Sequence, residues 1–217
     1  MNKILIQLSC SLDINDTVLK KRNQVENNDK RLEQIINGIK KFVEKKYNAD
    51  IIFVDNTIPE KIPIDKELEK LLIDNNIQIF HDNKNIYGSI NKGAGVIESW
   101  LFVKEKLKNY DYILYFEPRL YLENFDFINN FLESPRNLFV YGNDKNHFFT
   151  GLFGIKTELL LKYVDKFKHP KHFINLGCIE QHIFNFIKNN DSYETLEKAN
   201  VIWYSGFSNY KNLIINF

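Results

Sequence analysis

The sequence predicts an α/β fold with a mostly parallel central sheet and helices on both faces. Short apolar runs without polar alternation, typical of buried strands, occur at residues 4–9, 51–54, 77–80, 112–116 and 138–141. Segments with helical periodicity separate the first four of these runs. This alternation over 217 residues predicts βαβ units and a parallel sheet.

The helical segments are recognised by apolar side chains that recur on one face. Residues 29–47 carry six of them, with Asn28 or Asp29 as the N-cap. Shorter helices are predicted around residues 68–72 and over 97–107, and later ones over 157–167 and from about residue 177. The polar stretch 12–28 predicts either a mobile segment or a functionally idle loop.

Composition excludes several classes of protein. The chain has 29 basic and 28 acidic residues, so its charge gives no reason to expect a nucleic-acid partner. The two cysteines, Cys10 and Cys178, fit a reducing compartment. No apolar run approaches the roughly 18 residues of a membrane helix. We therefore expect a cytoplasmic protein.

The stretch "IIFVDNT" places Asp55 and Asn56 directly after a predicted buried strand. A carboxylate at the carboxyl end of such a strand accepts hydrogen bonds from a base or ribose lying across the sheet edge. The alternative is an Asx turn, in which both side chains bond to neighbouring backbone amides. Local sequence alone favours the turn.

The stretch "NIYGSINKGAGVIESW" combines Asn91 and Lys92 with two glycines at the start of a predicted helix. Free amides and the helix dipole at that position favour an anion. The lysine precedes the glycines, so the stretch is not a P-loop, and it follows the wrong strand for a dinucleotide fingerprint. A helix start that binds no ligand is equally compatible with it.

The stretch "YILYFEPRLY" ends a predicted inner strand in Glu117, Pro118 and Arg119. Glu117 has the chemistry to ligate a hard cation or to accept sugar hydroxyls. Arg119 has the planar fork that suits a diphosphate. An exposed Glu–Arg pair without function is the alternative, but the position after an inner strand favours a site.

The stretch "NLGCIEQHIFNFI" predicts a helix with Glu180 in its first turn. A general base for a hydroxyl nucleophile and a simple first-turn acid are equally compatible with that position. His182 is a single histidine without a metal-spaced partner, which favours a structural role. Cys178 is interpreted as a packing residue.

Taken in order, these stretches and "TGLFGIK" resemble the GT-A glycosyltransferases, closest to the family 2-like enzymes of bacterial surface polysaccharide synthesis. The resemblance covers most of residues 1–190. It implies a nucleotide-binding sandwich in which Asp55 and Asn56 bind the nucleotide part of the donor. The resemblance also assigns Asn91 and Lys92 to the ribose or phosphates, and places Glu117 and Arg119 at the diphosphate.

The same resemblance makes Glu180 the catalytic base of an inverting transfer. It puts three further residues on the acceptor side: Thr150, Gly151 and His182. The whole chain, 1–217, would be one GT-A-like domain, with a nucleotide-sugar-binding half at 1–120 and an acceptor-side half at 121–217.

The metal motif of that family is altered here. "EPR" stands where these enzymes usually carry Asp-x-Asp, which holds Mg²⁺ or Mn²⁺ on the diphosphate. A guanidinium about 4 Å from a divalent cation repels it by several kcal/mol at an effective dielectric near 20. We therefore predict transfer that is metal-independent or only weakly metal-assisted, with Arg119 in the place of the cation and Glu117 a poor metal ligand.

The resulting prediction is a glycosyltransferase that moves a sugar from a nucleotide-diphosphate sugar to a glycan or lipid-linked glycan. It would act in the synthesis of capsule, lipo-oligosaccharide or a related surface glycan. A sugar nucleotidyltransferase and a catalytically degenerate GT-A-like binding module are the alternatives. The short C-terminal part favours a homodimer or a partner subunit, and the family implies a cytoplasmic location with or without peripheral attachment to the inner membrane.

Overall fold

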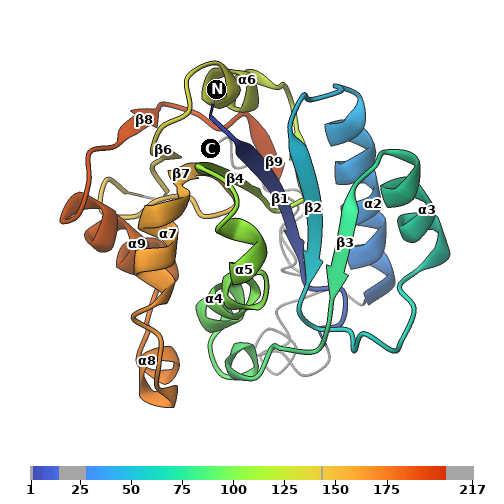
Figure 1. Ribbon diagram of the computed structural model, residues 1–217, viewed down its shortest axis with the longest axis horizontal. Helices are drawn as coiled ribbons and strands as arrows, with labels where there is room; N and C mark the ends of the chain where they lie inside the picture. The colour runs from blue at the N-terminus through green and yellow to red at the C-terminus, as the bar shows by residue number, and fades with distance from the viewer. Residues whose placement is uncertain (1, 15–27, 143, 204–217) are drawn as a thin grey trace.

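The computed structural model describes residues 2–14, 28–142 and 144–203, and within them a seven-stranded sheet forms the centre of the molecule (Figure 1). The order of its strands is β3-β2-β1-β4-β7-β6-β8. The strands are β1 (Ile4–Cys10), β2 (Asp50–Asp55), β3 (Gln78–His81), β4 (Tyr112–Phe116), β6 (Leu138–Val140), β7 (Leu152–Lys156) and β8 (Glu194–Leu196). A separate antiparallel pair is formed by β5 (Leu120–Leu122) and β9 (Val201–Trp203).

Strand direction brings the polar stretches of the sequence to one edge. β1 pairs in parallel with β2 and with β4, and β2 pairs in parallel with β3. The carboxyl ends of these four strands therefore meet at the same edge of the sheet, where open α/β sheets bind their ligands. All five predicted strands are present, and the predicted parallel arrangement holds through this half of the sheet.

Strand β7 is one of the strands that the sequence patterns did not predict, together with β5 and β8. It lies antiparallel between β4 and β6, while β6 and β8 are parallel to each other. Gly154 sits in its middle, and a Cβ there would lie 2.2 Å from the ring of Phe131. A glycine within a strand weakens the apolar pattern, yet here it makes room for an aromatic ring.

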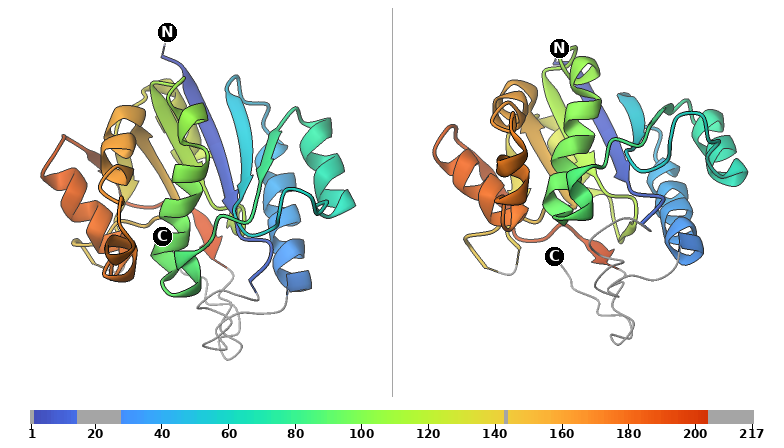
Figure 2. Two further views of the ribbon diagram at one scale, coloured as in Figure 1. Left: turned by 60° about the horizontal axis from the view of Figure 1, so that its bottom comes forward. Right: turned by 90° about the horizontal axis from the view of Figure 1, so that it is seen from below.

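Helices cover both faces of the sheet, as predicted (Figure 2). One core, around Trp100, lies under α4, α7 and α9, and the other, around Phe42, lies under α2, α3 and α6. The helices are α2 (Asn28–Val43), α3 (Lys66–Asp74), α4 (Lys92–Phe102), α5 (Lys104–Leu107), α6 (Asp126–Glu133), α7 (Thr157–Val164), α8 (Pro170–Ile174) and α9 (Ile179–Lys188). A 3₁₀ turn, η1 (Tyr87–Ser89), precedes α4.

Helix boundaries differ from the sequence expectation in two places. The helix predicted over 97–107 is divided at Val103 into α4 and α5, and α4 begins at Lys92. Asn91 is its N-cap, with Oδ1 accepting a 2.8 Å hydrogen bond from the backbone N–H of Gly93. Both glycines of the motif therefore lie inside the helix, not in a loop before it.

Several expectations concern the chain as a whole. Most of the polar stretch 12–28 falls on residues 15–27, which lie outside the described part of the chain. Strands from 1–120 and from 121–217 share one sheet, and the functional division at residue 120 stays a prediction. Among the described residues, no helix is both long and apolar enough to span a membrane.

Candidate active site

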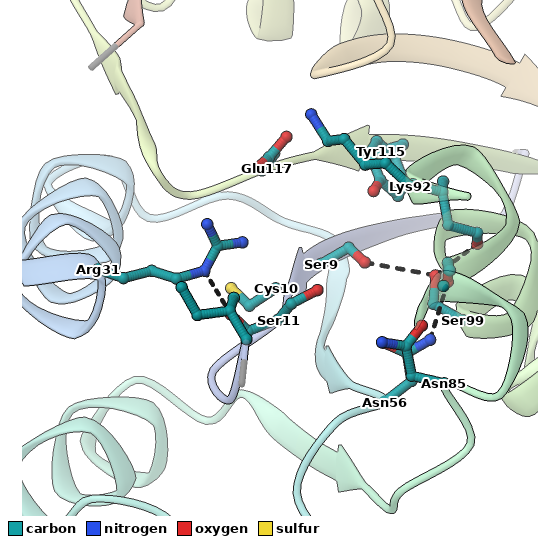
Figure 3. Close-up of a pocket in the computed structure, with 14 residues that line it drawn as sticks. Ser9, Cys10, Ser11, Arg31, Asn56, Asn85, Lys92, Ser99, Tyr115 and Glu117 are labelled. Carbon is teal, nitrogen blue, oxygen red and sulfur yellow. Dashed lines mark hydrogen bonds between the residues drawn. The ribbon is translucent and has the colours of Figure 1, made fainter. Parts of the chain in front are cut away.

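Two adjoining hollows lie at the edge where β1, β2 and β4 end. The first, here called the inner cavity, has a volume of about 60 Å³ and is lined by β1, α2, α4 and the ends of β2 and β4 (Figure 3). The second, here called the outer crevice, has a volume of about 390 Å³. Residues of the inner cavity used below are Ser9, Ser11, Arg31, Asn56, Asn85, Lys92 and Glu117. Those of the outer crevice are Lys92, Glu117, Thr150, Gly151, Cys178 and Glu180.

Many of the predicted site residues meet at these hollows. Lys92 and Glu117 line both, so the inner cavity and the outer crevice share a wall. Asn56 lines the inner cavity, while Thr150, Gly151 and Glu180 line the outer crevice. Four predicted residues line neither hollow: Asp55, Asn91, Arg119 and His182.

Asp55 is fully buried, and the turn that follows β2 holds its carboxylate. Oδ1 accepts hydrogen bonds from the backbone N–H groups of Thr57 (2.9 Å) and Ile58 (2.8 Å). Oδ2 accepts a 2.7 Å hydrogen bond from the backbone N–H of Leu12, which follows β1. Burial raises the pKa of Asp55, and these hydrogen bonds act against that rise. The geometry supports the Asx-turn interpretation, and a contact between Asp55 and a base stays a prediction.

The two predicted asparagines connect elements that surround the site. Asn56 is buried, and its Nδ2 donates a 2.8 Å hydrogen bond to the carbonyl of Gly95 in α4. Asn91 Nδ2 donates a 3.2 Å hydrogen bond to the carbonyl of Gly177, in the loop before α9. Asn91 thus caps α4 and also fixes the approach of α9, and this leaves the exposed Lys92 at the junction of the two hollows.

The turn after β4 holds an ion pair between the buried Arg119 and the partly buried Glu117. Nε of Arg119 donates a 3.1 Å hydrogen bond to Oε1 of Glu117, and Nη2 of Arg119, whose side chain is 6% exposed, lies 3.0 Å from the same oxygen. Burial of Glu117 opposes its ionisation, but Arg119, Lys92 and Arg31 outweigh that effect and lower its pKa to about 2. The expectation that Arg119 itself faces the ligand is not what the structure shows, because Arg119 lies behind Glu117 and pairs with it.

Helix α2 approaches this turn very closely. A Cβ on Gly38 would lie 1.6 Å from the carbonyl oxygen of Pro118, a distance that no side chain tolerates. Arg31 lies seven residues earlier and therefore on the same face of α2. The glycine lets that face, and with it the guanidinium of Arg31, reach the edge of the sheet.

Glu180 lies in the first turn of α9 and lines the outer crevice. Its Oε1 accepts a 3.5 Å hydrogen bond from the hydroxyl of Thr150, and its Oε2 accepts one of 3.1 Å from the thiol of Cys178. Within the described part of the chain, no cationic side chain forms an ion pair with it. A carboxylate in this setting has the free lone pairs that a general base needs.

His182 faces away from the crevice. Its Nδ1 lies 3.0 Å from the hydroxyl of Tyr163, and its ring packs near Phe167. Burial, with a smaller contribution from Lys166, lowers the pKa of His182. This geometry supports the structural role that the sequence favours for His182. It does not support the assignment of His182 to the acceptor side.

Sequence patterns missed two residues of the inner cavity, Arg31 and Asn85. Arg31 lies in the segment predicted as an amphipathic helix, and Asn85 opens the stretch "NIYGSINKGAGVIESW" without a role assigned to it. A cation at a position that the helical periodicity assigns to the buried face was the available signal. Glu98 was also missed: it accepts backbone hydrogen bonds from Ile86, Tyr87 and Gly88, and so holds the loop that carries Asn85 against α4.

The residues at the turn do not fit a divalent metal. Glu117 is the single carboxylate there, and Arg119 occupies its Oε1. Lys92 lines both hollows beside it. Among the described residues, no group of three or more His, Cys, Asp or Glu side chains is arranged to hold a metal ion. We therefore assign no step to a metal.

Comparison with known proteins agrees with the fold. No model of a known protein family matches the sequence, and no curated protein is significantly similar to it. A nucleoside-diphosphate-sugar pyrophosphorylase from Vibrio cholerae RC9 has a similar structure, with a TM-score of 0.52 and 14% identity over 94% of this chain and 96% of that one. A putative nucleotide-diphospho-sugar transferase from Desulfovibrio desulfuricans G20 has a TM-score of 0.51 and 13% identity over 91% and 80%.

At these identities the likeness concerns the fold alone. The chain has a mostly parallel central sheet with helices on both faces, an α/β fold like that of the nucleotide-diphospho-sugar transferases. This confirms the fold class that the sequence predicted. Membership of the family 2-like glycosyltransferases stays a prediction.

Proposed function

We propose that this protein transfers a sugar from a nucleotide-diphosphate sugar to a hydroxyl group of a glycan or lipid-linked glycan. The observation that carries the proposal is the outer crevice, in which Glu180 and Lys92 line one hollow next to the inner cavity. A base and a cation on the same crevice are what displacement of a diphosphate by a hydroxyl requires.

In the proposed reaction part of the nucleotide of the donor enters the inner cavity and its sugar extends into the outer crevice. Glu180 accepts the proton of the acceptor hydroxyl while the acceptor oxygen forms a bond to the anomeric carbon. The bond between that carbon and the diphosphate oxygen breaks, and its electron pair leaves with the nucleoside diphosphate. Attack from the side opposite the leaving group inverts the anomeric configuration.

The leaving diphosphate gains negative charge, and Lys92 is the cation placed to stabilise it. Glu117 keeps Arg119 in place behind the wall of the crevice and is itself held ionised by the surrounding cations. The protein's own cations thus take the role that a divalent metal has in enzymes with two carboxylates at this turn. Synthesis of capsule, lipo-oligosaccharide or a related surface glycan is the pathway we propose for the product.

A second function, sugar nucleotidyl transfer, is supported by one observation. The sequence lacks a glycine- and basic-rich turn after β1, but Arg31 brings a guanidinium to that strand end, where it donates to the carbonyl of Ser11. A cation there would also suit the triphosphate of a nucleotide. The two reactions differ in the bond that breaks, which lies at the sugar carbon in one and at the α-phosphorus in the other.

The test uses the purified full chain with a panel of nucleotide-diphosphate sugars, with and without glycan acceptors, and measures release of nucleoside diphosphate. A parallel reaction contains nucleoside triphosphates with sugar 1-phosphates and measures release of pyrophosphate. The proposal expects nucleoside diphosphate from at least one donor and no pyrophosphate.

Other outcomes contradict the proposal in distinct ways. Pyrophosphate release would assign the chain to sugar nucleotidyl transfer. If nucleotides raise the melting temperature while neither product forms, the chain is a binding module without catalysis.

A further inference from the structure

Arg31 is a buried cation whose hydrogen-bonding capacity is only partly used within the described structure. The residue is 6% exposed and projects from α2 into the inner cavity (Figure 3). Its Nε donates to the carbonyl oxygen of Ser11, but its Nη1 is buried and has no partner among the described residues. A buried donor without a partner costs free energy, about 1–3 kcal/mol and more when it is charged. Such a cost is expected where a ligand supplies the missing acceptor.

The charges around Arg31 leave the cavity short of anions. Arg119 lies close enough to Arg31 to disfavour its charge, and Glu117 is committed to Arg119. Asp55 also lies near, but its oxygens accept hydrogen bonds from the turns after β1 and β2. Burial together with Arg119 lowers the pKa of Arg31 to about 9. With Lys92 on the wall, the cavity lacks the negative charge that would balance its cations.

A second unused polar group lies elsewhere on the cavity wall. Oδ1 of Asn85 is buried without a hydrogen-bond partner among the described residues, and Asn85 belongs to the lining of the same cavity. A Cβ at Gly88 would lie 1.8 Å from this oxygen, and one at Gly95 would lie 2.6 Å from it. The two glycines therefore make the space that the side chain of Asn85 occupies. Its oxygen accepts a hydrogen bond, so a ligand must offer an N–H or O–H there.

From these unused groups we infer that the inner cavity binds a nucleoside diphosphate in two parts: Arg31 binds a phosphate oxygen, and Asn85 accepts a hydrogen bond from the base or ribose. The inference rests on the proposed function in one respect, the choice of a nucleoside diphosphate as the ligand. It assigns roles to two residues that the sequence patterns left without one: Arg31, and Asn85 at the start of the stretch "NIYGSINKGAGVIESW". It also makes Arg31, not Arg119, the buried guanidinium that contacts phosphate, with Lys92 as the second cation.

The test measures binding by calorimetry and thermal shift, with UDP, CDP, GDP, ADP and the matching nucleosides as probes, and requires no turnover. Arg31→Met should weaken binding of the diphosphate at least tenfold, and binding of the nucleoside by less than twofold. Asn85→Ala should weaken both probes to a similar extent. Arg31→Lys should retain part of the diphosphate affinity, because the charge remains but the planar fork is lost.

Lys40→Gln is the matched control for charge. Lys40 lies on the same helix, is half-exposed and pairs with Glu67 at 2.8 Å, so its loss should leave diphosphate binding unchanged. A ligand-binding role also predicts that Arg31→Met keeps or raises the melting temperature of the ligand-free protein, because the mutation removes an unbalanced buried charge.

The alternative is that Arg31 only stabilises the fold through Ser11. In that case Arg31→Met would lower the melting temperature, and the folded Arg31→Lys variant would bind diphosphate as tightly as the wild type. That result, or failure of every diphosphate to bind the wild type, would overturn the inference. Loss of turnover with these binding differences intact would instead contradict only the proposed function.

Discussion

Two glutamates line the outer crevice, and their surroundings differ. Glu117 pairs with Arg119 at 3.0 Å, lies in the field of two further cations, and has a pKa lowered to about 2. Glu180 accepts hydrogen bonds only from a hydroxyl and a thiol, and within the described chain it forms no ion pair. The first is a fixed anion at any physiological pH. The second is not paired with a cation among the described residues.

The contrast shows how one residue type serves two purposes in one hollow. A carboxylate surrounded by cations cannot accept a proton readily, because protonation would remove the charge that stabilises its neighbours. A carboxylate without a cationic partner leaves its oxygens available to an acceptor hydroxyl. We therefore expect mutation of Glu180 to affect the reaction rate, and mutation of Glu117 to affect the stability of the fold first.

The largest expected effect is that of Glu180→Gln. The amide keeps the shape of the side chain but cannot accept a proton, so nucleoside-diphosphate release to an acceptor should fall by about 10²–10⁴-fold. The melting temperature should change little. Glu158→Gln, another acid exposed in the first turn of a helix, is the control and should retain full activity. Retention of turnover by Glu180→Gln would show that Glu180 is not the general base.

The next largest expected effect is on the stability of the fold. Glu117→Gln leaves the guanidinium of Arg119 buried without a counter-charge, and removal of one partner of a buried pair costs about 3–5 kcal/mol. The free energy of unfolding, measured by urea denaturation at pH 7, should fall accordingly. Glu67→Gln removes the acid of the exposed pair with Lys40 and should change it by less than about 0.5 kcal/mol. Equal effects of the two mutations would show that burial does not distinguish these pairs.

The pH dependence of that effect follows from the pKa of Glu117. Its value in the folded protein, about 2, lies below its ordinary value of 4.5, so ionisation of Glu117 stabilises the fold by about 3 kcal/mol above pH 4.5. That contribution is lost as the pH falls from 4.5 through 2. The difference in unfolding free energy between wild type and Glu117→Gln should therefore shrink over this range. A difference that stays constant down to pH 2.5 would contradict the lowered pKa.

The smallest expected effect is that of chelation. Because Arg119 occupies Oε1 of Glu117, a divalent cation gains little binding free energy at this turn. Nucleoside-diphosphate release should change by less than twofold after exhaustive treatment with EDTA, and Mg²⁺ or Mn²⁺ added back should not raise it further. A strict requirement for Mn²⁺ would mean that the ion pair opens when the donor binds.

Much of the sheet follows from the sequence, and the exceptions have physical reasons. The strands β1 to β4 are short apolar runs, and burial on both faces makes such runs recognisable without tertiary information. β7 was not predicted because Gly154, which accommodates Phe131, interrupts its apolar pattern. Glu180, Glu117 and Lys92 were found because each lies at the end of a recognisable element. Arg31 was not found: helical periodicity assigns it to the buried face, but only packing shows that its guanidinium reaches the cavity.

The sequence by itself determined the α/β class and the edge of the sheet where polar residues gather, because periodicity and strand direction are local properties. Tertiary structure decided which charges face the ligand. Arg119 turned inward onto Glu117, while Arg31 entered the cavity from α2 through the close approach at Gly38. These orientations depend on contacts between residues far apart in the chain, which a pattern in one short stretch does not specify.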